Sequence, residues 1–259
     1  MPMPTFRKDL PHAPVGYARW EATGLRWLGA AYAGCVPAVT EVGDRHLTMA
    51  RLTPAPATPA AAEEFGRILA AVHDAGAAAY GAPPDGWSGD GWLGPADEPL
   101  PLPLNTTRPD LTWGVFWADL RIDAVLDLGR RRRTWREGDL APFRAVADRA
   151  RKGDFDDGDS PARLHGDLWS GNLVFTAEGP RMIDPAAYGG HRESDLAMLA
   201  LFGAPHLPRI LAAYAEAHPL TDGWRDRVAL HQLHPLLLHA VLFGGGYAAT
   251  ARSAALRYA

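Results

Sequence analysis

The segment from Leu164 to Pro185 constrains the fold of this chain more than any other part of it. It begins with Leu-His-Gly-Asp-Leu-Trp-Ser-Gly-Asn and continues through an apolar run and a turn, Ala-Glu-Gly-Pro, to Arg-Met-Ile-Asp-Pro. The apolar runs on both sides of the turn predict a hairpin, and the polar stretch before them predicts a loop. We therefore expect Asp167 and Asn172, on the loop, to converge with Asp184, on the second strand of the hairpin.

These three side chains are the set that phosphoryl transfer requires. A carboxylate accepts the proton of the attacking hydroxyl, and hard oxygen ligands hold Mg²⁺ against the phosphates of a nucleotide. The spacing from Asp167 to Asn172 equals the aspartate-to-asparagine spacing of the kinase catalytic loop. The alternative is that these residues form turn hydrogen bonds and that Asp184 caps a loop. Asp184 argues against it, because a carboxylate at the end of an apolar strand is costly to bury unless a positive group meets it.

The chain before this segment predicts two lobes. Hydrophobic patterns indicate a first unit with a strand, a helix and two further strands, at 5–8, 18–33, 38–42 and 46–51. A proline-rich stretch follows that can continue neither a helix nor a strand. We place the boundary there and expect a small N-terminal lobe at 1–52, a linker at 53–59 and a larger lobe at 60–259.

The larger lobe is predicted to be mostly helical. Apolar residues recur with helical spacing around 60–75, 113–128, 141–151, 195–201, 207–218 and 224–243. Between Gly81 and Pro109 the chain is rich in Gly, Pro and Trp. We interpret that stretch as an irregular loop, long enough to be functional.

Charge and composition exclude several classes of partner. The net charge of −4 gives no reason to expect nucleic acid, which normally requires a basic surface. The start of the chain lacks a signal-peptide pattern, and no run of about 18 apolar residues indicates a membrane span. One cysteine, Cys35, excludes an intrachain disulfide framework and fits a reducing compartment. We therefore expect a cytoplasmic protein without a nucleic-acid or membrane partner.

The sequence resembles the fructosamine kinase family, which is related to aminoglycoside and choline phosphotransferases. The resemblance runs from about Phe6 to the C-terminus and is carried by Leu164–Asn172, Ile183–Ala186, Tyr188–Glu193, Asp195–Met198, Leu201–Gly203 and Phe243–Tyr247. The family uses ATP to phosphorylate the sugar part of ketoamines. The implied fold is α+β: a protein-kinase-like, two-lobed fold with a reduced N-terminal β lobe and a mostly helical C-terminal lobe.

The resemblance also implies roles for residues that bind the nucleotide and the metal. Asp167 would be the catalytic base, and Asn172 and Asp184 would hold Mg²⁺. Lys8 would contact the phosphates of ATP and Glu21 would orient it, although on sequence alone both could be ordinary surface residues. The interlobe hinge that faces adenine with backbone groups would be Met49, Ala50, Arg51 and Leu52.

Substrate contacts are implied in the catalytic loop, around a large-lobe helix and after Asp184. The residues are Trp169, Asn105, Trp117, Arg121, His191, Arg192 and Glu193. A tryptophan face suits the apolar face of a sugar. Trp113 and Trp117 lie four residues apart on one helix face, so core packing is an equal alternative for both.

Several polar residues later in the chain have structural interpretations. Asp195 begins a predicted helix, where its carboxylate would cap free backbone amides. His231, His234 and His239 have helical spacing, but no carboxylate or cysteine completes a metal site with them. We interpret these histidines as core or surface residues.

Three functional interpretations stay open on the sequence. Only Met1–Thr5 precede Phe6, where kinases of this class carry a glycine-bearing hairpin over the phosphates. The first interpretation is an active kinase for small-molecule or protein-bound ketoamines, a monomer or weak homodimer. The second is a truncated, weak or inactive member that binds a nucleotide or a ketoamine. The third is a kinase for another hydroxylated amine, such as an aminoglycoside.

Overall fold

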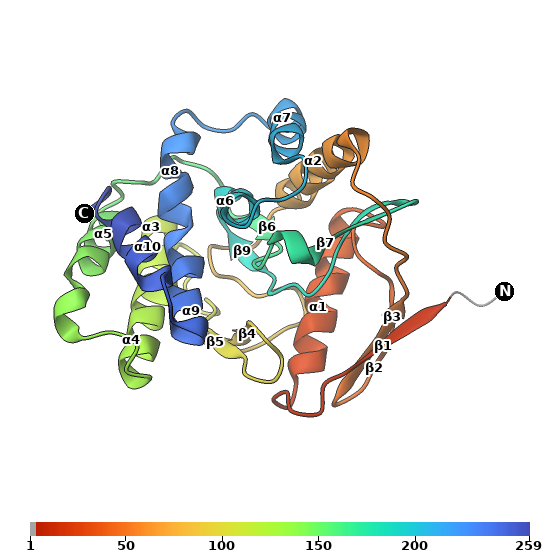
Figure 1. The fold of residues 1–259 in the computed structure, drawn as a ribbon, viewed down its shortest axis with the longest axis horizontal. Coiled ribbons are helices and arrows are strands. Elements are labelled where there is room, and N and C mark those ends of the chain that lie inside the picture. The colour runs from red at the N-terminus through yellow and green to blue at the C-terminus, as the bar shows by residue number, and fades with distance from the viewer. Residues whose placement is uncertain (1–3) are drawn as a thin grey trace.

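The computed structural model describes residues 4–259. The expectation about the segment ahead of Phe6 falls partly on Met1–Met3, which lie outside the described residues. Figure 1 shows a sheet and one helix on one side of the molecule and a group of helices on the other, with short strands between them. No helix within residues 4–259 is both long and apolar enough to cross a membrane.

The first unit is a three-stranded antiparallel sheet covered by one helix. Its strands have the order β1-β3-β2, with Lys8 paired opposite Leu47. Leu47 and Met49 point from the sheet into a small core that they share with Ala22 and Leu25 of the helix. The bounds are β1 Thr5–Asp9, α1 Tyr17–Ala31, β2 Val39–Val42 and β3 His46–Ala50. The strands and the helix lie within two residues of the predicted positions.

The proline-rich stretch leads directly into α2, Pro59–Asp74. The Thr58 side chain accepts a hydrogen bond from the backbone N–H of Ala61, and Pro59 occupies the first turn, where its missing N–H is tolerated. α2 packs against α7, Leu207–Ala217. Gly66 permits this contact, because a Cβ there would lie 2.3 Å from the Ile210 carbonyl oxygen.

The middle of the chain corrects one prediction. We expected 81–109 to be irregular, but it contains a hairpin of β4, Gly91–Leu93, and β5, Leu100–Leu102. Leu100 and Leu102 point inward while Pro101 between them is exposed. This alternation is only three residues long and is flanked by prolines, so it was too short to recognise as a strand.

The predicted helix at 113–128 contains a change of helix type. α3, Trp113–Trp117, continues through a π-helical stretch, Ala118–Asp123, into α4, Ala124–Arg131. The π-helical stretch carries Arg121, whose guanidinium carbon lies 4.6 Å from the centre of the Phe116 ring and 4.1 Å from that of Tyr188. A buried cation is thereby held between two aromatic faces.

The long apolar segment at 224–243 is two helices rather than one. α8, Trp224–His231, is capped by Gln232, and α9, Leu233–Phe243, begins at the next residue. The physical reason is Pro235, which has no N–H to donate to the carbonyl of His231 and so cannot continue α8. After the three glycines the chain turns into α10, Tyr247–Ala255.

Short strands and one helix form the frame around the catalytic-loop motif. β6, Ala162–Leu164, pairs with β9, Tyr188–Gly190, and β7, Leu173–Thr176, pairs with β8, Gly179–Met182. α6, Glu193–Leu201, follows β9 directly. α5, Ala141–Arg151, lies farther out among the helices of the larger unit (Figure 1).

Candidate active site

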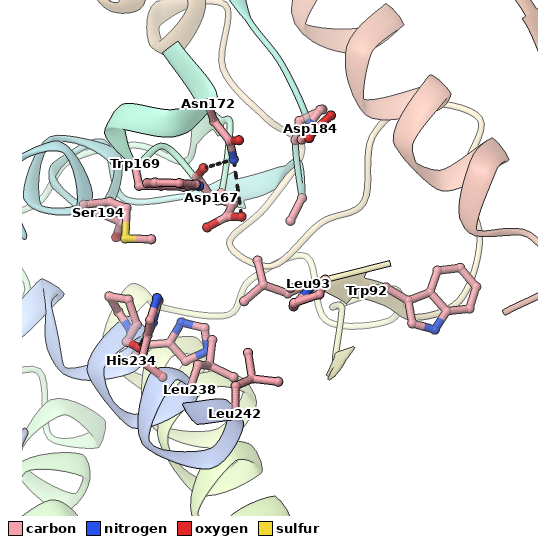
Figure 2. Close-up of a pocket in the computed structure, with 18 of the residues that line it drawn as sticks. Trp92, Leu93, Asp167, Trp169, Asn172, Asp184, Ser194, His234, Leu238 and Leu242 are labelled. Atoms are coloured by element: carbon pink, nitrogen blue, oxygen red, sulfur yellow. Dashed lines mark hydrogen bonds between the residues drawn. The ribbon is translucent and has the colours of Figure 1, made fainter. Parts of the chain in front are cut away.

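The loop between β6 and β7 brings Asp167 and Asn172 into contact. The Asn172 side-chain amide donates to the backbone oxygen of Asp167 at 2.8 Å and to its carboxylate Oδ2 at 3.4 Å (Figure 2). Because the amide nitrogen is occupied in this way, the side-chain oxygen of Asn172 is left as an acceptor. The loop therefore holds a carboxylate and an amide oxygen side by side.

Asp184 is held next to this pair, but not on a strand. β8 ends at Met182, two residues earlier than the prediction required. The backbone N–H of Ile183 donates to the Asn172 carbonyl at 3.0 Å, which fixes the chain just before Asp184. Asp184 itself has φ +53°, the left-handed conformation that aspartate tolerates better than most residues. This turn directs its carboxylate to the same cavity as Asp167.

Lys8 joins the first unit to this loop. Its Nζ donates to both Glu21 carboxylate oxygens and to Asp184 Oδ1, each at 2.9 Å. Burial alone would lower the pKa of Lys8, but the charges of Glu21 and Asp184 outweigh burial and raise it. Glu21 is only 2% exposed, and burial raises its pKa to about 7 against the opposing effect of Lys8. The predicted pair of Lys8 and Glu21 is thus present in the structure, and it reaches Asp184.

Asp167 is half-buried and lies near like charges. Burial raises its pKa to about 7, and the neighbouring charges of Asp184 and Asp195 act in the same direction, whereas the hydrogen bond from Asn172 opposes them. A carboxylate with a pKa near neutrality is suited to accept and return a proton.

Asp195 fixes the backbone of the loop from behind. Its two oxygens accept hydrogen bonds from the backbone N–H groups of His165, at 2.8 Å, and Gly166, at 3.0 Å. His73 contacts the same carboxylate at 3.2 Å and accepts at its other nitrogen from the Tyr214 hydroxyl at 2.7 Å. The sequence predicted a cap for the helix that Asp195 begins, but the carboxylate caps the loop instead.

A cavity of about 640 Å³ opens between this loop and α9. Asp167, Trp169, Asn172 and Asp184 lie on one side of it, and His234, Leu238 and Leu242 of α9 lie opposite (Figure 2). Lys8, Trp117 and Arg121 also line it. The cavity is therefore a space where a polar reacting group meets a largely apolar wall.

Other predicted site residues lie outside the cavity. The side chain of Asn105 forms hydrogen bonds to the backbone. Its amide donates to the Tyr80 and Arg108 carbonyls, and its oxygen accepts from the Arg108 N–H. Trp113, for which core packing was an alternative, stacks on Trp117 with ring centres 5.6 Å apart and is buried. The remaining predicted residues that do not line the cavity are Glu21, Met49, Ala50, Arg51, Leu52, His191, Arg192 and Glu193.

Residues that the prediction missed line the cavity on α9 and on the β4–β5 hairpin. On α9, His234, Leu238 and Leu242 follow each other at intervals of four, the spacing of one helix face. That spacing was visible in the sequence, but it did not reveal that the face opposes Asp167.

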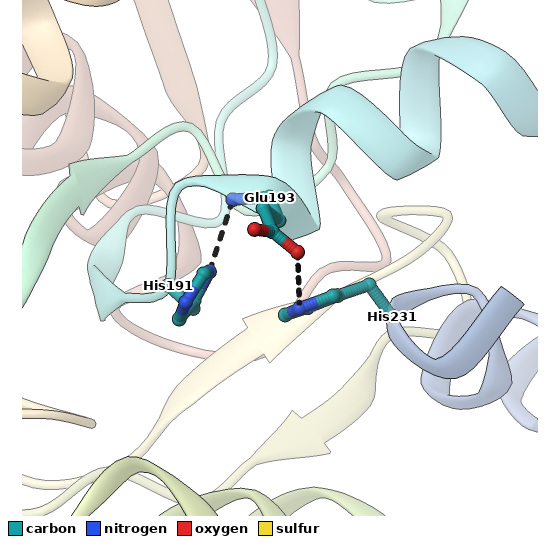
Figure 3. A group of neighbouring side chains, drawn as sticks. All are labelled: His191, Glu193 and His231. Carbon is teal, nitrogen blue, oxygen red and sulfur yellow. Dashed lines mark hydrogen bonds and ion pairs between the residues drawn. The ribbon is translucent and has the colours of Figure 1, made fainter. Parts of the chain in front are cut away.

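The segment at 191–193 belongs to a buried ion-pair network behind the cavity. Figure 3 shows His191 and His231 on either side of Glu193, whose Oε2 lies 3.3 Å from the His231 Nε2. Glu193 thus places a carboxylate beside His231, one of the three histidines near which the sequence predicted none. The guanidinium of Arg227 bonds to both Glu193 oxygens and contacts Asp157 at 2.9 Å. A cation of the protein itself therefore balances the charge of Glu193.

The lowered pKa of His231 predicts that the folded protein loses stability in acid. Burial lowers its pKa from 6.5 to about 4, so the folded protein keeps it neutral while the unfolded chain protonates it below pH 6.5. The stability it contributes is present above pH 6.5 and is lost as the pH falls toward 4. Between pH 7 and pH 5 this loss amounts to about 2 kcal/mol.

Urea denaturation at pH 7 and pH 5 measures this effect. We expect the free energy of unfolding to fall less from pH 7 to pH 5 in His231→Gln than in the wild type. His12→Gln, at an exposed position, is the matched control and should keep the wild-type difference. An unchanged difference in His231→Gln would contradict the assignment.

Comparison with known proteins places this chain in a family. The model of the fructosamine kinase family matches residues 10–258. A protein named Probable ketoamine kinase from Lactiplantibacillus plantarum is 32% identical over 247 residues, which cover 93% of this chain and 82% of that protein. A Probable ketoamine kinase from Thermus thermophilus is 35% identical over 237 residues, which cover 90% of this chain and 79% of that protein.

Solved structures agree with the fold. A crystal structure described as a candidate fructosamine-3-kinase from Thermobifida fusca has a TM-score of 0.87 and 47% identity, covering 98% of this chain and 86% of that one. The aminoglycoside phosphotransferase APH(2'')-Ib with bound ADP has a TM-score of 0.54 and 10% identity, covering 88% and 78%. The second likeness shows the shared kinase-like fold alone, so the α+β kinase-like prediction is confirmed.

Proposed function

The chain belongs to the fructosamine kinase family, and from that membership we propose that it phosphorylates a sugar hydroxyl of ketoamines, with ATP as the phosphoryl donor. The substrate is a ketoamine on a small molecule or on a protein. A cytoplasmic location and a monomeric or weakly dimeric state remain predictions. The aminoglycoside alternative has only distant fold neighbours in its favour.

One observation supports the proposal most strongly. Lys8 bridges Glu21, on a helix of the first unit, and Asp184, beside the catalytic-loop motif, with all contacts at 2.9 Å. In kinases a lysine held by a glutamate contacts the nucleotide phosphates, and an aspartate beside them holds the metal. The same relation between the two halves of the chain supports a small lobe at 1–52, a linker at 53–59 and a larger lobe at 60–259. Backbone groups at 49–52 would then face adenine.

The oxygen atoms beside Asp167 fit Mg²⁺. Asn172 offers an amide oxygen and Asp184 a partly exposed carboxylate, of which Lys8 occupies one oxygen. Mg²⁺ prefers such hard oxygen ligands and keeps several of its waters. We propose that Asn172 and Asp184 hold the ion, which when bound neutralises negative charge on the phosphates.

Side chains of the protein carry out the other parts of the phosphoryl transfer. Asp167 accepts the proton of the attacking sugar hydroxyl as the bond from that oxygen to the γ-phosphorus forms and the bond from the phosphorus to the leaving oxygen of ADP breaks. Lys8 stabilises negative charge on the phosphates, and Asp195 keeps the loop in position through its contacts to the backbone. Trp169, 41% exposed at the edge of the cavity, offers an aromatic face to the sugar.

Replacement of Lys8 tests the role of the bridge. In Lys8→Met we expect kcat/KM for ATP to fall by about a hundredfold, because a donor to the transferring phosphate is lost. Ketoamine-dependent ATP consumption at varied ATP concentrations measures this. Lys152→Met, at an exposed lysine, is the matched control and should behave as the wild type.

Lys8→Met also leaves Glu21 buried without its partner, so a loss of stability could imitate a loss of function. The double variant Lys8→Met, Glu21→Gln removes that buried charge. It should recover thermal stability without recovering kcat/KM for ATP. Recovery of both would mean that Lys8 only supports the fold.

A further inference from the structure

His234 is a polar residue on the α9 face that opposes Asp167. It lies four and eight residues before Leu238 and Leu242, and all three line the cavity across from the catalytic-loop motif (Figure 2). Leu93, from the β4–β5 hairpin, lines the same cavity. A hydrogen-bonding side chain is thus placed beside two leucines on the wall across from Asp167.

Within residues 4–259, neither ring nitrogen of His234 has a hydrogen-bond partner. The neighbouring histidines differ in this respect. His231 shares a hydrogen bond with the Ser194 hydroxyl at 3.0 Å, and His239 donates from Nδ1 to the Pro235 carbonyl at 2.7 Å. His234 is half-buried and lines the cavity, so a hydrogen-bonding group of a ligand can replace the water that its ring nitrogens otherwise meet.

The chemistry of that partner follows from the charge state of the ring. Burial lowers the pKa of His234 well below 6.5, and the nearby Arg121 and His239 act in the same direction. The ring is therefore neutral near pH 7, with one nitrogen that donates and one that accepts. A hydroxyl group both donates and accepts, so it can bond either nitrogen of a neutral imidazole, whereas a carboxylate fits only the N–H and an ammonium only the bare nitrogen.

We propose that His234 binds a sugar hydroxyl of the ketoamine, other than the hydroxyl that Asp167 deprotonates, and so selects sugars that carry this second hydroxyl. The inference rests on the proposed function and deepens it. Asp167 and His234 lie on opposite walls, so one sugar can contact both only through different positions of its carbon chain. His234 is then a specificity-determining residue that does not take part in proton transfer.

The test uses ketoamines of one amine from which sugar hydroxyls beyond the reacting carbon are removed one at a time. In the wild type, loss of one particular hydroxyl should lower kcat/KM by about tenfold, the effect of one neutral hydrogen bond in an enclosed site. His234→Leu should lower kcat/KM by about tenfold for the complete sugar, yet leave the value for that deoxy sugar unchanged. His234→Gln keeps a donor and an acceptor and should recover part of the loss.

Thermal stability separates this role from a structural one. No hydrogen bond within residues 4–259 is lost in His234→Leu, so its melting temperature should equal or exceed that of the wild type. His12→Leu, at an exposed position, is the matched control and should change neither stability nor selectivity.

The outcomes that overturn the inference are distinct from those that overturn the function. If the wild type phosphorylates the whole series and His234→Leu lowers kcat/KM equally for every member, the inference is wrong and the proposed function stands. A lower melting temperature with such a uniform loss would assign His234 to the fold. If the wild type phosphorylates no ketoamine, both proposals fall.

Discussion

The Asp167→Asn variant is expected to lose ketoamine-dependent ATP consumption by at least about a thousandfold, because the amide cannot accept the proton of the sugar hydroxyl. Asparagine has nearly the shape of aspartate, so the change removes the charge and little else. Burial raises the pKa of this half-buried carboxylate to about 7, and the charges of Asp184 and Asp195 act in the same direction. Removing such a charge should leave the melting temperature at or above the wild-type value.

Steady-state ATP consumption and thermal denaturation of the same samples check this prediction. Asp97→Asn, at an exposed position on the β4–β5 connection, is the control and should match the wild type in both measurements. Turnover in Asp167→Asn within tenfold of the wild type would remove Asp167 from the mechanism. Loss of turnover together with unfolding would leave Asp167 a structural residue.

The largest effect on stability is expected at Asp195. Its replacement by alanine leaves the backbone amides of His165 and Gly166 and the ring of His73 without their acceptor in a buried place. Removing one member of such a buried charged network typically costs about 3–5 kcal/mol. We expect Asp195→Ala to lose that amount of unfolding free energy.

Urea denaturation at pH 7 measures the loss, with Asp222→Ala, at an exposed aspartate, as the control. Asp195→Asn keeps one acceptor oxygen and should lie between the alanine variant and the wild type. It remains measurable even if the alanine variant does not fold. A change below about 0.5 kcal/mol in Asp195→Ala would show that the loop does not depend on this residue.

The elements that sequence reasoning predicted well are those that depend on local patterns. Helical periodicity placed α1, α2 and α7, and the turn between apolar runs placed the hairpin of β7 and β8. The loop motif brought Asp167 and Asn172 together within one short segment, where spacing alone limits the geometry. The family, the kinase-like fold and the ketoamine kinase activity, inferred from the resemblance, are confirmed by the comparisons.

The features that sequence reasoning did not predict depend on contacts between distant segments. Asp195 bonds to a loop 29 and 30 residues earlier in the chain, and a helix-cap pattern in the sequence cannot distinguish that loop from its own helix. His234 lies on α9, a helix separate from α8, and lines the cavity across from Asp167. Neither residue carries a local signal for its partner.

The identity of the phosphorylated product is the most direct test of the central claim. Purified protein is incubated with ATP, Mg²⁺ and a ribulose- or fructose-modified lysine, and the product is examined by ³¹P NMR. The account predicts a new phosphate monoester on a sugar carbon of the ketoamine, formed by the wild type and not by Asp167→Asn. A folded wild-type protein that binds the ketoamine but forms no phosphate ester would contradict the account and favour a binding protein without turnover.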